Sequence, residues 1–358
     1  MSIRVVDAGL VPDIRSQSLY HGLAYARTDA TPDTILLVSP QEPYVSIGFH
    51  QELEKEIDMD FCERRHLRVL RREVGGGAVY LDQNQVFTQW VMGPERLPWE
   101  LPKRFELYAQ PTVRTYRALG IDAEFRPVND IHVSGRKIGG TGAAAIGKAE
   151  VMVGSLMFDF DTDLMSRLLK VPSEKFRDKV QGGLREYMTT MREELGERPD
   201  AETVKEIYLR ECQDALGESF KTGELTDEEW KMIEQLDAKL ASEGWLRKKG
   251  AVRPLGVKIH QDVWVGESIY KAQGGLIRVT ARLHRGRIED ISVSGDFTFH
   301  PHRKLVELEK NLIDGQLMED ALRQRLTHFY RHSGVQTPGV EVRDWLQAIL
   351  GLKEASVS

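Results

Sequence analysis

The chain has 358 residues, with 49 basic and 55 acidic side chains and a formal net charge of −6. Hydrophobic residues make up 41% and charged residues 29%, an ordinary globular composition that excludes collagen-like, low-complexity and charge-driven disordered proteins. The weak acidity gives no global electrostatic reason to bind nucleic acid, so we expect no nucleic-acid partner. The length predicts roughly two domains, and a chain this long can bury its core without disulfide bonds.

The two cysteines, Cys62 and Cys212, are too few for a disulfide framework, and no Cys-x-x-Cys pair indicates structural zinc. The N-terminal residues carry charge throughout and lack the apolar stretch of a signal peptide. The longest apolar runs, such as 35–38, fall far short of a membrane span. We therefore expect a reduced, cytoplasmic protein with no membrane partner.

Hydrophobic spacing predicts mixed helices and strands in the first third of the chain. The helical patterns cover 17–27, 51–65 and 103–119, and the strand patterns cover 34–38, 43–49, 67–74 and 85–92. Gly120 follows the last of these helices as the expected C-cap. The strand at 67–74 leads directly into three consecutive glycines.

A β-hairpin is predicted next, because VNDIHV and RKIGG flank Ser134-Gly135, a dipeptide suited to a tight turn. With a two-residue turn, Val133 pairs with Arg136, and His132 pairs with Lys137. The next predicted elements are a strand at 151–160, a short helix at 162–170, a lysine-bearing loop with a short helical piece at 171–183, and helices at 200–216 and 226–242.

The C-terminal part of the chain has its own pattern. The basic segment 247–254 (RKKGAVRP) changes the composition and is the expected domain boundary. Residues 276–297 then alternate with period two around a turn at Arg285-Gly286, and helical patterns follow at 303–313 and 316–331. These residues therefore predict a small α+β unit.

The strongest local motif is RREVGGGAVYLD, residues 71–82. Three glycines after a strand cost conformational entropy, but they let backbone N–H groups approach a ligand closely and point at an anion. The two arginines before them supply forked donors for a carboxylate or phosphate. The segment lacks the features of a P-loop or a dinucleotide fingerprint, and by itself it equally indicates a turn or a site of close packing.

On the predicted hairpin, Asp130 lies diagonal to Lys137 on the same face. A lysine beside a carboxylate can bind phosphate and hold Mg²⁺. The alternative is an ordinary solvated ion pair, which contributes little to stability.

Taken together, these motifs resemble the lipoate–protein ligase A family, within the wider superfamily of biotin and lipoate ligases and acyltransferases. The matching segments come in the family's order and cover most of the chain, which is more specific than one glycine-rich match. They are YVSIGFHQ (44–51), RREVGGGAVYLD (71–82), VNDIHVSGRKIGGTG (128–142), VGSLMFDFD (153–161), VPSEKFRDKV (171–180), and GRIEDISVSGDF (286–297) with LEKNL and Gly315.

The resemblance implies an α/β (α+β) fold. A large catalytic domain with a mixed sheet, related to class II synthetases and biotinyl–lipoyl ligases, would cover 1–248, and a small α+β accessory domain would cover 253–350. It also implies two half-reactions. Lipoate and Mg-ATP give lipoyl-adenylate and pyrophosphate, and the adenylate then acylates one lysine of a lipoyl domain or an H-protein-like carrier. We expect a monomer.

The resemblance also assigns roles to single residues. Lys137 is the expected catalytic residue, because its ammonium can bridge the carboxylate oxygen and the α-phosphate in both half-reactions. Asp130 is the expected Mg²⁺ ligand. Lys175 and Lys179 indicate a loop that closes over the adenylate, or else a solvated basic helix face. The expected substrate- and adenylate-binding residues are Arg72, Gly75, Gly76, Gly77, Ala78, Val79, Asn129, Asp130, Ile138 and Gly139.

Two positions depart from the family pattern. Leu81 stands where relatives carry a histidine before the aspartate, so any contact made by that imidazole is lost. His21 stands where relatives often carry an acidic residue. Neither change removes Arg72, the glycines or Lys137, and we expect activity to be retained.

The nearest alternative is an octanoyl- or lipoyltransferase of the same superfamily, which passes the acyl chain through a cysteine thioester after the lysine motif. No cysteine occurs between Lys137 and Cys212, Cys212 lies in a helical pattern typical of a structural residue, and Cys62 precedes the glycines. A non-catalytic lipoyl-binding relative stays open because of Leu81. A biotin ligase fits the triple glycine less well.

A metal site formed by His300 and His302 with His260 or His284 lacks the carboxylate or thiol spacing that would support zinc. The sequence identifies neither the acceptor nor a preference for lipoate over octanoate. The acceptors that stay open are a dehydrogenase E2 domain, a glycine-cleavage H protein and a specialised lipoate-binding carrier.

Overall fold

The computed structural model describes residues 2–248 and 263–352, and it leaves the side chains of residues 174 and 175 undescribed. The chain forms two compact units. The first comprises residues 2–47, 56–73 and 78–246, and the second comprises 48–55, 74–77, 247–248 and 263–352. Most of the predicted boundary segment at 247–254 lies outside the described residues. The three glycines belong to the same unit as the C-terminal residues.

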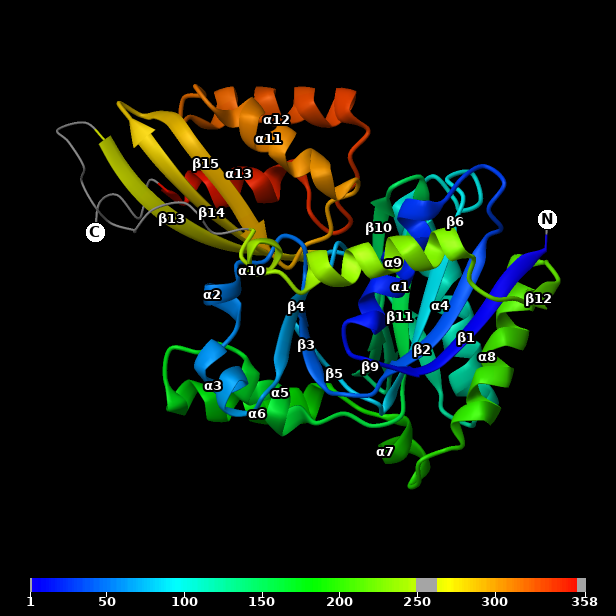
Figure 1. Ribbon diagram of the computed structural model, residues 1–358. Helices are drawn as coiled ribbons and strands as arrows, with labels where there is room; N and C mark the ends of the chain where they lie inside the picture. The colour runs from blue at the N-terminus through cyan, green and yellow to red at the C-terminus, as the bar shows by residue number, and fades with distance from the viewer. Residues whose placement is uncertain (1, 249–262, 353–358) are drawn as a thin grey trace. The chain divides into compact units, whose positions relative to one another are not determined.

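The first unit is built on a six-stranded mixed sheet with the strand order β10-β11-β6-β2-β1-β12 (Figure 1). Strand β1 pairs in parallel with β2 and β12, and the other neighbours are antiparallel. The strands are β1 (Ile3–Val11), β2 (Thr34–Pro40), β6 (Gln85–Met92), β10 (Gly142–Ile146), β11 (Ala149–Met157) and β12 (Phe220–Thr222).

Helices cover both faces of this sheet, and for this reason every residue of β2 and β6 is buried. In Figure 1, α1 and α9 pack together on one face, and α4 and α8 pack together on the other. The core on the α4–α8 side includes Trp90, Phe105 and Tyr208. The helices are α1 (Arg15–Ala26), α4 (Leu101–Ala118), α8 (Ala201–Leu216) and α9 (Asp227–Leu240).

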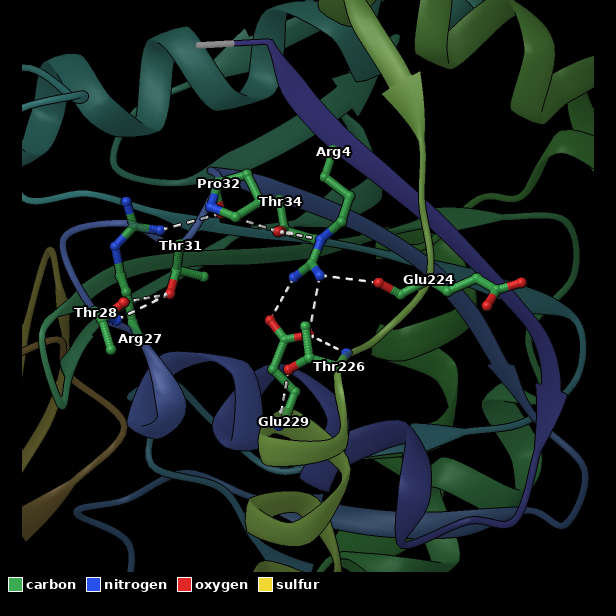
Figure 2. Close-up of polar contacts among 9 residues, drawn as sticks. All are labelled: Arg4, Arg27, Thr28, Thr31, Pro32, Thr34, Glu224, Thr226 and Glu229. Carbon is green, nitrogen blue, oxygen red and sulfur yellow. Dashed lines mark hydrogen bonds and ion pairs between the residues drawn. The ribbon is translucent and has the colours of Figure 1, made fainter.

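A buried ion pair ties the first strand to the start of α9 (Figure 2). The guanidinium of Arg4 donates to both carboxylate oxygens of Glu229, at 2.9 and 2.5 Å, and the two side chains are only 10% and 4% exposed. Glu229 also accepts the backbone N–H of Thr226 at 2.8 Å within the capping box that begins α9. Glu229 therefore caps its helix and neutralises Arg4 at the same time.

Two three-stranded sheets of the first unit carry the predicted motifs. In the first, with order β4-β3-β5, β3 runs parallel to β4 and antiparallel to β5; the second, β7-β8-β9, is antiparallel throughout. Their strands are β3 (Tyr44–Ile47), β4 (Arg68–Arg71), β5 (Val79–Leu81), β7 (Ala123–Arg126), β8 (Asp130–Val133) and β9 (Arg136–Gly140). Shorter helical elements connect the strands: α2 (Leu53–Glu56), α3 (Met59–Arg64), α5 (Thr162–Leu168), α6 (Glu174–Tyr187), α7 (Met191–Leu195) and α10 (Glu243–Leu246).

The second unit is an antiparallel sheet, β13-β14-β15, with α11, α12 and α13 packed on it (Figure 1). Arg285 and Gly286 form the turn between β14 and β15 with φ of 49° and 74°, as their position between two alternating segments predicts. The elements are β13 (Val263–Ala272), β14 (Gly275–His284), β15 (Arg287–Gly295), the 3₁₀ turn His302–Lys304, α11 (Leu305–Leu312), α12 (Glu319–Ser333) and α13 (Val342–Leu350).

The predicted fold class, a mixed α/β unit with a small C-terminal α+β unit, is confirmed. Two local predictions were wrong. Residues 171–183 are not mainly a loop, because Ser173 caps a helix of 14 residues, α6, by accepting the N–H of Phe176. Residues 51–65 are not one helix, because Ile57 forms a β-bridge with Leu169 between α2 and α3. Among the described residues, no helix combines the length and apolarity needed to cross a membrane.

Candidate functional site

The β8–β9 hairpin brings together the lysine and aspartate singled out by the sequence. Its turn, Ser134-Gly135, has φ of 50° and 83°, and His132 pairs with Lys137 as predicted. Beyond that pair the register shifts by one residue, so that Asp130 lies opposite Gly140. The hairpin therefore carries both charged side chains on two short, paired strands.

Lys137 and Asp130 form an ion pair, with Nζ 2.7 Å from Oδ1. Gly140 leaves room for it, because a β-carbon there would stand 3.1 Å from Nζ and 3.5 Å from Oδ1. The two side chains are 28% and 24% exposed. Because the pair is partly exposed, the ammonium can leave Asp130 at a cost of the order of 1 kcal/mol. Gly140 was not singled out in the sequence analysis, although a glycine within a strand indicates that other atoms approach the backbone closely.

Three other predicted residues of the hairpin support its backbone. The side-chain amide of Asn129 donates to the carbonyl of Thr141, and the backbone carbonyl of Asn129 accepts the N–H and hydroxyl of Thr141 at 2.8 and 3.0 Å. Ile138 is fully buried in the core, and Gly139 is buried beside it. Their direct contact with a ligand stays a prediction.

Arg72 follows β4 and is buried. It donates from Nη1 to the carbonyl and the hydroxyl of Ser46, at 3.0 and 3.3 Å, and its backbone N–H donates to the carbonyl of Ile47 at 3.1 Å. Burial lowers the pKa of Arg72 to about 10, against the fields of Tyr20 and Tyr44, which raise it. The guanidinium is thus a buried cation that keeps its charge at neutral pH.

Glu73, which sequence reasoning did not single out, ties the arginine motif to two helices. Its carboxylate accepts from the hydroxyl of Tyr25 at 2.8 Å and from Nζ of Lys239 at 2.8 Å. Burial alone would raise the pKa of Glu73, but the fields of His21 and Lys239 and the hydrogen bonds from Lys239 and Tyr25 outweigh it and lower the pKa to about 2. Glu73 is therefore an ionised anchor.

His21 has a structural role in this network. Its Nε2 accepts the backbone N–H of Glu73 at 3.1 Å, and its Nδ1 lies 2.7 Å from the carbonyl of Gln17. Burial lowers the pKa of His21 more than the field of Glu73 raises it. A neutral imidazole can accept this N–H while donating through Nδ1, whereas an acidic side chain would bring a second negative charge beside Glu73.

Arg71 fixes the other side of the motif. Its guanidinium donates through Nε and Nη2 to the carbonyl of Leu246, at 2.9 and 2.7 Å, and its own carbonyl accepts the indole N–H of Trp245 at 2.8 Å. The ammonium of Lys239 lies over the Trp245 ring, 4.2 Å from its centroid. Helix α10 and the end of α9 therefore hold the backbone that leads to the glycines.

The glycine triplet lies in the second unit. Gly76 has φ of +88°, a conformation that favours glycine. A β-carbon on Gly75 would stand 3.0 Å from the carbonyl oxygen of Phe297, whereas one on Gly77 would stand 3.7 Å from the Asp296 side chain, an ordinary contact. Close packing against Phe297 therefore explains why residue 75 is a glycine. That a ligand approaches the three glycines stays a prediction.

After the glycines, the chain returns to the first unit through Ala78, which is partly buried. Val79 begins β5 with its side chain 36% exposed, and Leu81 pairs with Tyr44 across β3. Leu81 thus occupies an ordinary strand position.

The segment expected to close over an adenylate is helix α6. Lys179 is exposed on it, and the side chain of Lys175 lies outside the described residues. Nη1 of Arg177 donates to the carbonyls of residues 166, 167 and 169 at the end of α5, at 3.0 to 3.2 Å. Since α6 is fastened to α5, the solvated helix face is the interpretation that fits Lys179.

Asp130 is suited to share Mg²⁺ with a nucleotide. Mg²⁺ at such sites takes one or two carboxylates and completes its shell with phosphates and water, and Asp130 is a partly exposed carboxylate beside a cation. A dedicated protein cage is absent from residues 2–248 and 263–352, where no group of three His, Cys, Asp or Glu side chains could hold a metal. His284, His300 and His302 form no such group among the described residues, and His260 lies outside them.

Both cysteines are buried and free, Cys62 in α3 and Cys212 in α8. Burial raises the pKa of the Cys62 thiol to about 11, and burial also raises that of Cys212. A nucleophilic cysteine needs a lowered pKa and access to solvent, so neither thiol is suited to form an acyl thioester. The structural interpretation of Cys212 is confirmed by its place in the core.

A family model described as the lipoyl protein ligase A/B catalytic domain matches residues 18–213, more than half of the chain. The chain is 28% identical over 250 residues to octanoyltransferase LipM of Kyrpidia tusciae, covering 63% of this chain and 91% of that protein. It is 26% identical over 257 residues to lipoate–protein ligase 1 of Staphylococcus aureus, covering 71% of this chain and 73% of that protein.

Solved structures are similar as well. One comes from an archaeal lipoylation system of Thermoplasma acidophilum, a bi-partite lipoate protein ligase and its E2 lipoyl domain; the TM-score is 0.64 and the identity 25%, over 72% of this chain and 100% of that chain. A second is a lipoate-protein ligase A bound with ATP, with a TM-score of 0.60 and 22% identity over 69% of this chain and 99% of that chain. At 22% identity, the similarity to this second structure shows a shared fold.

Proposed function

Because the chain belongs to the lipoyl protein ligase A/B catalytic domain family, we propose that it is an ATP-dependent lipoate–protein ligase. Enzymes of this family act in lipoyl or octanoyl transfer to proteins. In the proposed reaction, lipoate attacks the α-phosphate of ATP, giving lipoyl-AMP and pyrophosphate. The ε-amino group of a carrier lysine then attacks the adenylate carbonyl, and AMP leaves.

Lys137 supplies the charge that both steps require. Negative charge develops first on the oxygens around the α-phosphate and then on the carbonyl oxygen of the adenylate. The ammonium is held at the surface of the hairpin by one weak ion pair with Asp130, so it is accessible to these oxygens. We assign Lys137 as the catalytic residue on this basis.

Two further charged groups support the nucleotide in this proposal. Asp130 would bind Mg²⁺ through its carboxylate when the ammonium of Lys137 moves to the substrate, and the metal would offset phosphate charge. Arg72, a buried cation with Ser46 beside it, would contact a phosphate or the lipoate carboxylate. The glycines, with Ala78 and Val79, would line the acyl and phosphate site.

The observation that favours a ligase over a transferase is the burial of both cysteines. A transferase that works through a thioester needs a reactive thiol, and the sequence offers only Cys62 and Cys212. Their raised pKa values and buried positions both oppose such a role. Activation by ATP needs no protein nucleophile.

Octanoyl transfer is the second candidate, because the similarity to an octanoyltransferase spans 91% of that relative's length. This reaction would take its acyl group from an acyl-carrier donor and would need no ATP. The donor requirement therefore separates the two candidates directly.

The proposed acceptor is a lipoyl domain or an H-protein-like carrier, since a lipoate protein ligase with a similar structure is described with its E2 lipoyl domain. The proposal places the reaction in the cytoplasm, where free cysteines such as these stay reduced. It takes the active species to be a monomer, with catalysis by residues 1–248 and an accessory role for 253–350.

Lipoate-dependent ATP–pyrophosphate exchange tests the first half-reaction without a carrier. The wild-type chain should catalyse exchange only when free lipoate is present. Lys137→Ala should abolish exchange while its unfolding midpoint stays close to that of the wild type. Absence of exchange in the wild type would refute the ligase, and full exchange in Lys137→Ala would refute the assignment of Lys137.

A further inference from the structure

The residues that follow α6 hold strand β9 at Lys137. The backbone N–H of Thr189 donates to the carbonyl of Lys137 at 2.9 Å, and Met188 forms a β-bridge with the same lysine. The hydroxyl of Thr189 donates to Oε1 of Glu194 at 2.5 Å, and that oxygen also accepts from Arg136 at 2.6 Å. The chain after α6 is therefore fastened to β9 at the catalytic lysine and at its neighbour.

Tyr187, the last residue of α6, reaches the other member of the ion pair. Its hydroxyl donates to Oδ2 of Asp130 over 3.4 Å, while Lys137 lies at Oδ1, 2.7 Å away. The Tyr187 ring stands edge-on to the buried imidazole of His132, with their centroids 5.7 Å apart. This contact directs the hydroxyl toward the carboxylate.

Oδ2 of Asp130 receives its hydrogen bond from the hydroxyl of Tyr187. His132 Nε2 lies 3.8 Å from this oxygen, which is too far for a hydrogen bond. Among the described residues, the hydroxyl of Tyr187 is thus the one hydrogen-bond donor to Oδ2 of Asp130. Each oxygen of the carboxylate has its own partner.

We propose that Tyr187 is a positioning residue for the Lys137–Asp130 pair. The phenol restrains rotation of the Asp130 carboxylate through Oδ2, while Thr189 holds the backbone of β9 at Lys137. The ammonium is then the moving partner, which leaves Asp130 for a substrate oxygen and returns afterwards. Tyr187 is 43% exposed, so a ligand at the hairpin can reach the same surface. This inference rests on the proposed ligase function.

Tyr187→Phe tests the proposal, because it removes only the hydroxyl and keeps the ring against His132. In the full chain, kcat for lipoate-dependent exchange should fall roughly tenfold, the size expected for one hydrogen bond to a charged group, with the lipoate KM unchanged. The matched control is Tyr270→Phe, which removes a hydroxyl that reaches Asp344 Oδ1 over 3.3 Å in the second unit. The control should keep wild-type kcat and KM.

A double-mutant cycle separates positioning from a general structural role. In an Asp130→Asn background, Tyr187→Phe should cost little further activity, because the group through which it acts is gone. An equal loss in both backgrounds, or no loss in Tyr187→Phe alone, would overturn the proposal.

Amine labelling of Lys137, followed by peptide mass spectrometry, gives a readout that does not need turnover. The lysine should react severalfold faster in Tyr187→Phe than in the wild type or in Tyr270→Phe, because a carboxylate that turns freely holds the ammonium less well. Equal labelling in all three chains would contradict the role of Tyr187. Absence of exchange in the wild type would instead refute the ligase function, and labelling would still decide the role of the tyrosine.

Discussion

The ammonium group of Lys137 lies over Gly140, in the space that a side chain would fill. A β-carbon on Gly140 would stand 3.1 Å from Nζ and 3.2 Å from Cε of the lysine. Such distances are shorter than most real contacts of a β-carbon, so the end of the lysine side chain would have to shift by a few tenths of an ångström. A residue with no side chain thus helps to define where the charge of Lys137, the proposed catalytic residue, lies.

Gly140→Ala should therefore displace the ammonium and lower lipoate-dependent exchange about tenfold or more, as expected when a catalytic group is misplaced by a fraction of an ångström. The unfolding midpoint should change little, because the lysine side chain is flexible enough to move away. Gly182→Ala is a control with no described atom within 4 Å of its β-carbon. Unchanged exchange in Gly140→Ala would show that the position of the ammonium over this glycine is irrelevant to activity.

The glycine triplet should divide into a packing position and an approach position. Gly75→Ala places a β-carbon 3.0 Å from the Phe297 carbonyl oxygen and should destabilise the second unit by about 1–3 kcal/mol. Gly77→Ala meets its nearest described atom at 3.7 Å and should keep wild-type stability while it loses exchange activity. Thermal unfolding and exchange kinetics measured together check this. Full exchange activity in Gly77→Ala would contradict the prediction that a ligand approaches this glycine.

Glu73 should make stability depend on pH. Its pKa is about 2 in the folded chain, below its ordinary value, so it stabilises the fold above about pH 4.5 and loses this effect as pH falls toward 2. The contribution should be of the order of 2–3 kcal/mol. Urea unfolding of wild type and Glu73→Gln should differ most near about pH 6, and the difference should shrink below about pH 4.5 and vanish near about pH 2. A difference that stays constant with pH would contradict the ionised anchor.

Glu229→Gln should destabilise the first unit strongly. The change leaves the guanidinium of Arg4 buried without its countercharge, which typically costs about 3–5 kcal/mol. Glu228→Gln, one residue earlier on the exposed side of the same helix, is the matched control and should cost little. Urea midpoints of the two variants check this, and equal midpoints would show that the ion pair in Figure 2 adds nothing.

The hairpin was predictable because its signals are local. Ser134-Gly135 has turn chemistry, and the two-residue turn fixes the pairing of His132 with Lys137. The register shift beyond that pair has no such signal, and it brings Gly140 opposite Asp130. The sequence thus predicted the ion pair, but not the glycine beneath the lysine.

The support of the arginine motif could not be predicted, because it joins distant parts of the chain. Glu73 and Lys239 are 166 residues apart, and no periodicity relates them. Helix α6 was missed for a related reason. Its Gly182 and Gly183 disfavour a helix, but tertiary contacts such as that of Arg185 with Asp163, at 2.7 Å, override the local preference.

The mass of the acceptor protein gives the most direct test of the central claim. The purified chain should be incubated with an apo lipoyl domain and each acyl source in turn: free lipoate with Mg-ATP, or an octanoyl-carrier protein without ATP. The account predicts one lipoyl group on a single lysine in the first reaction and no modification in the second. Octanoylation from the carrier without ATP, with no product from free lipoate and Mg-ATP, would contradict it.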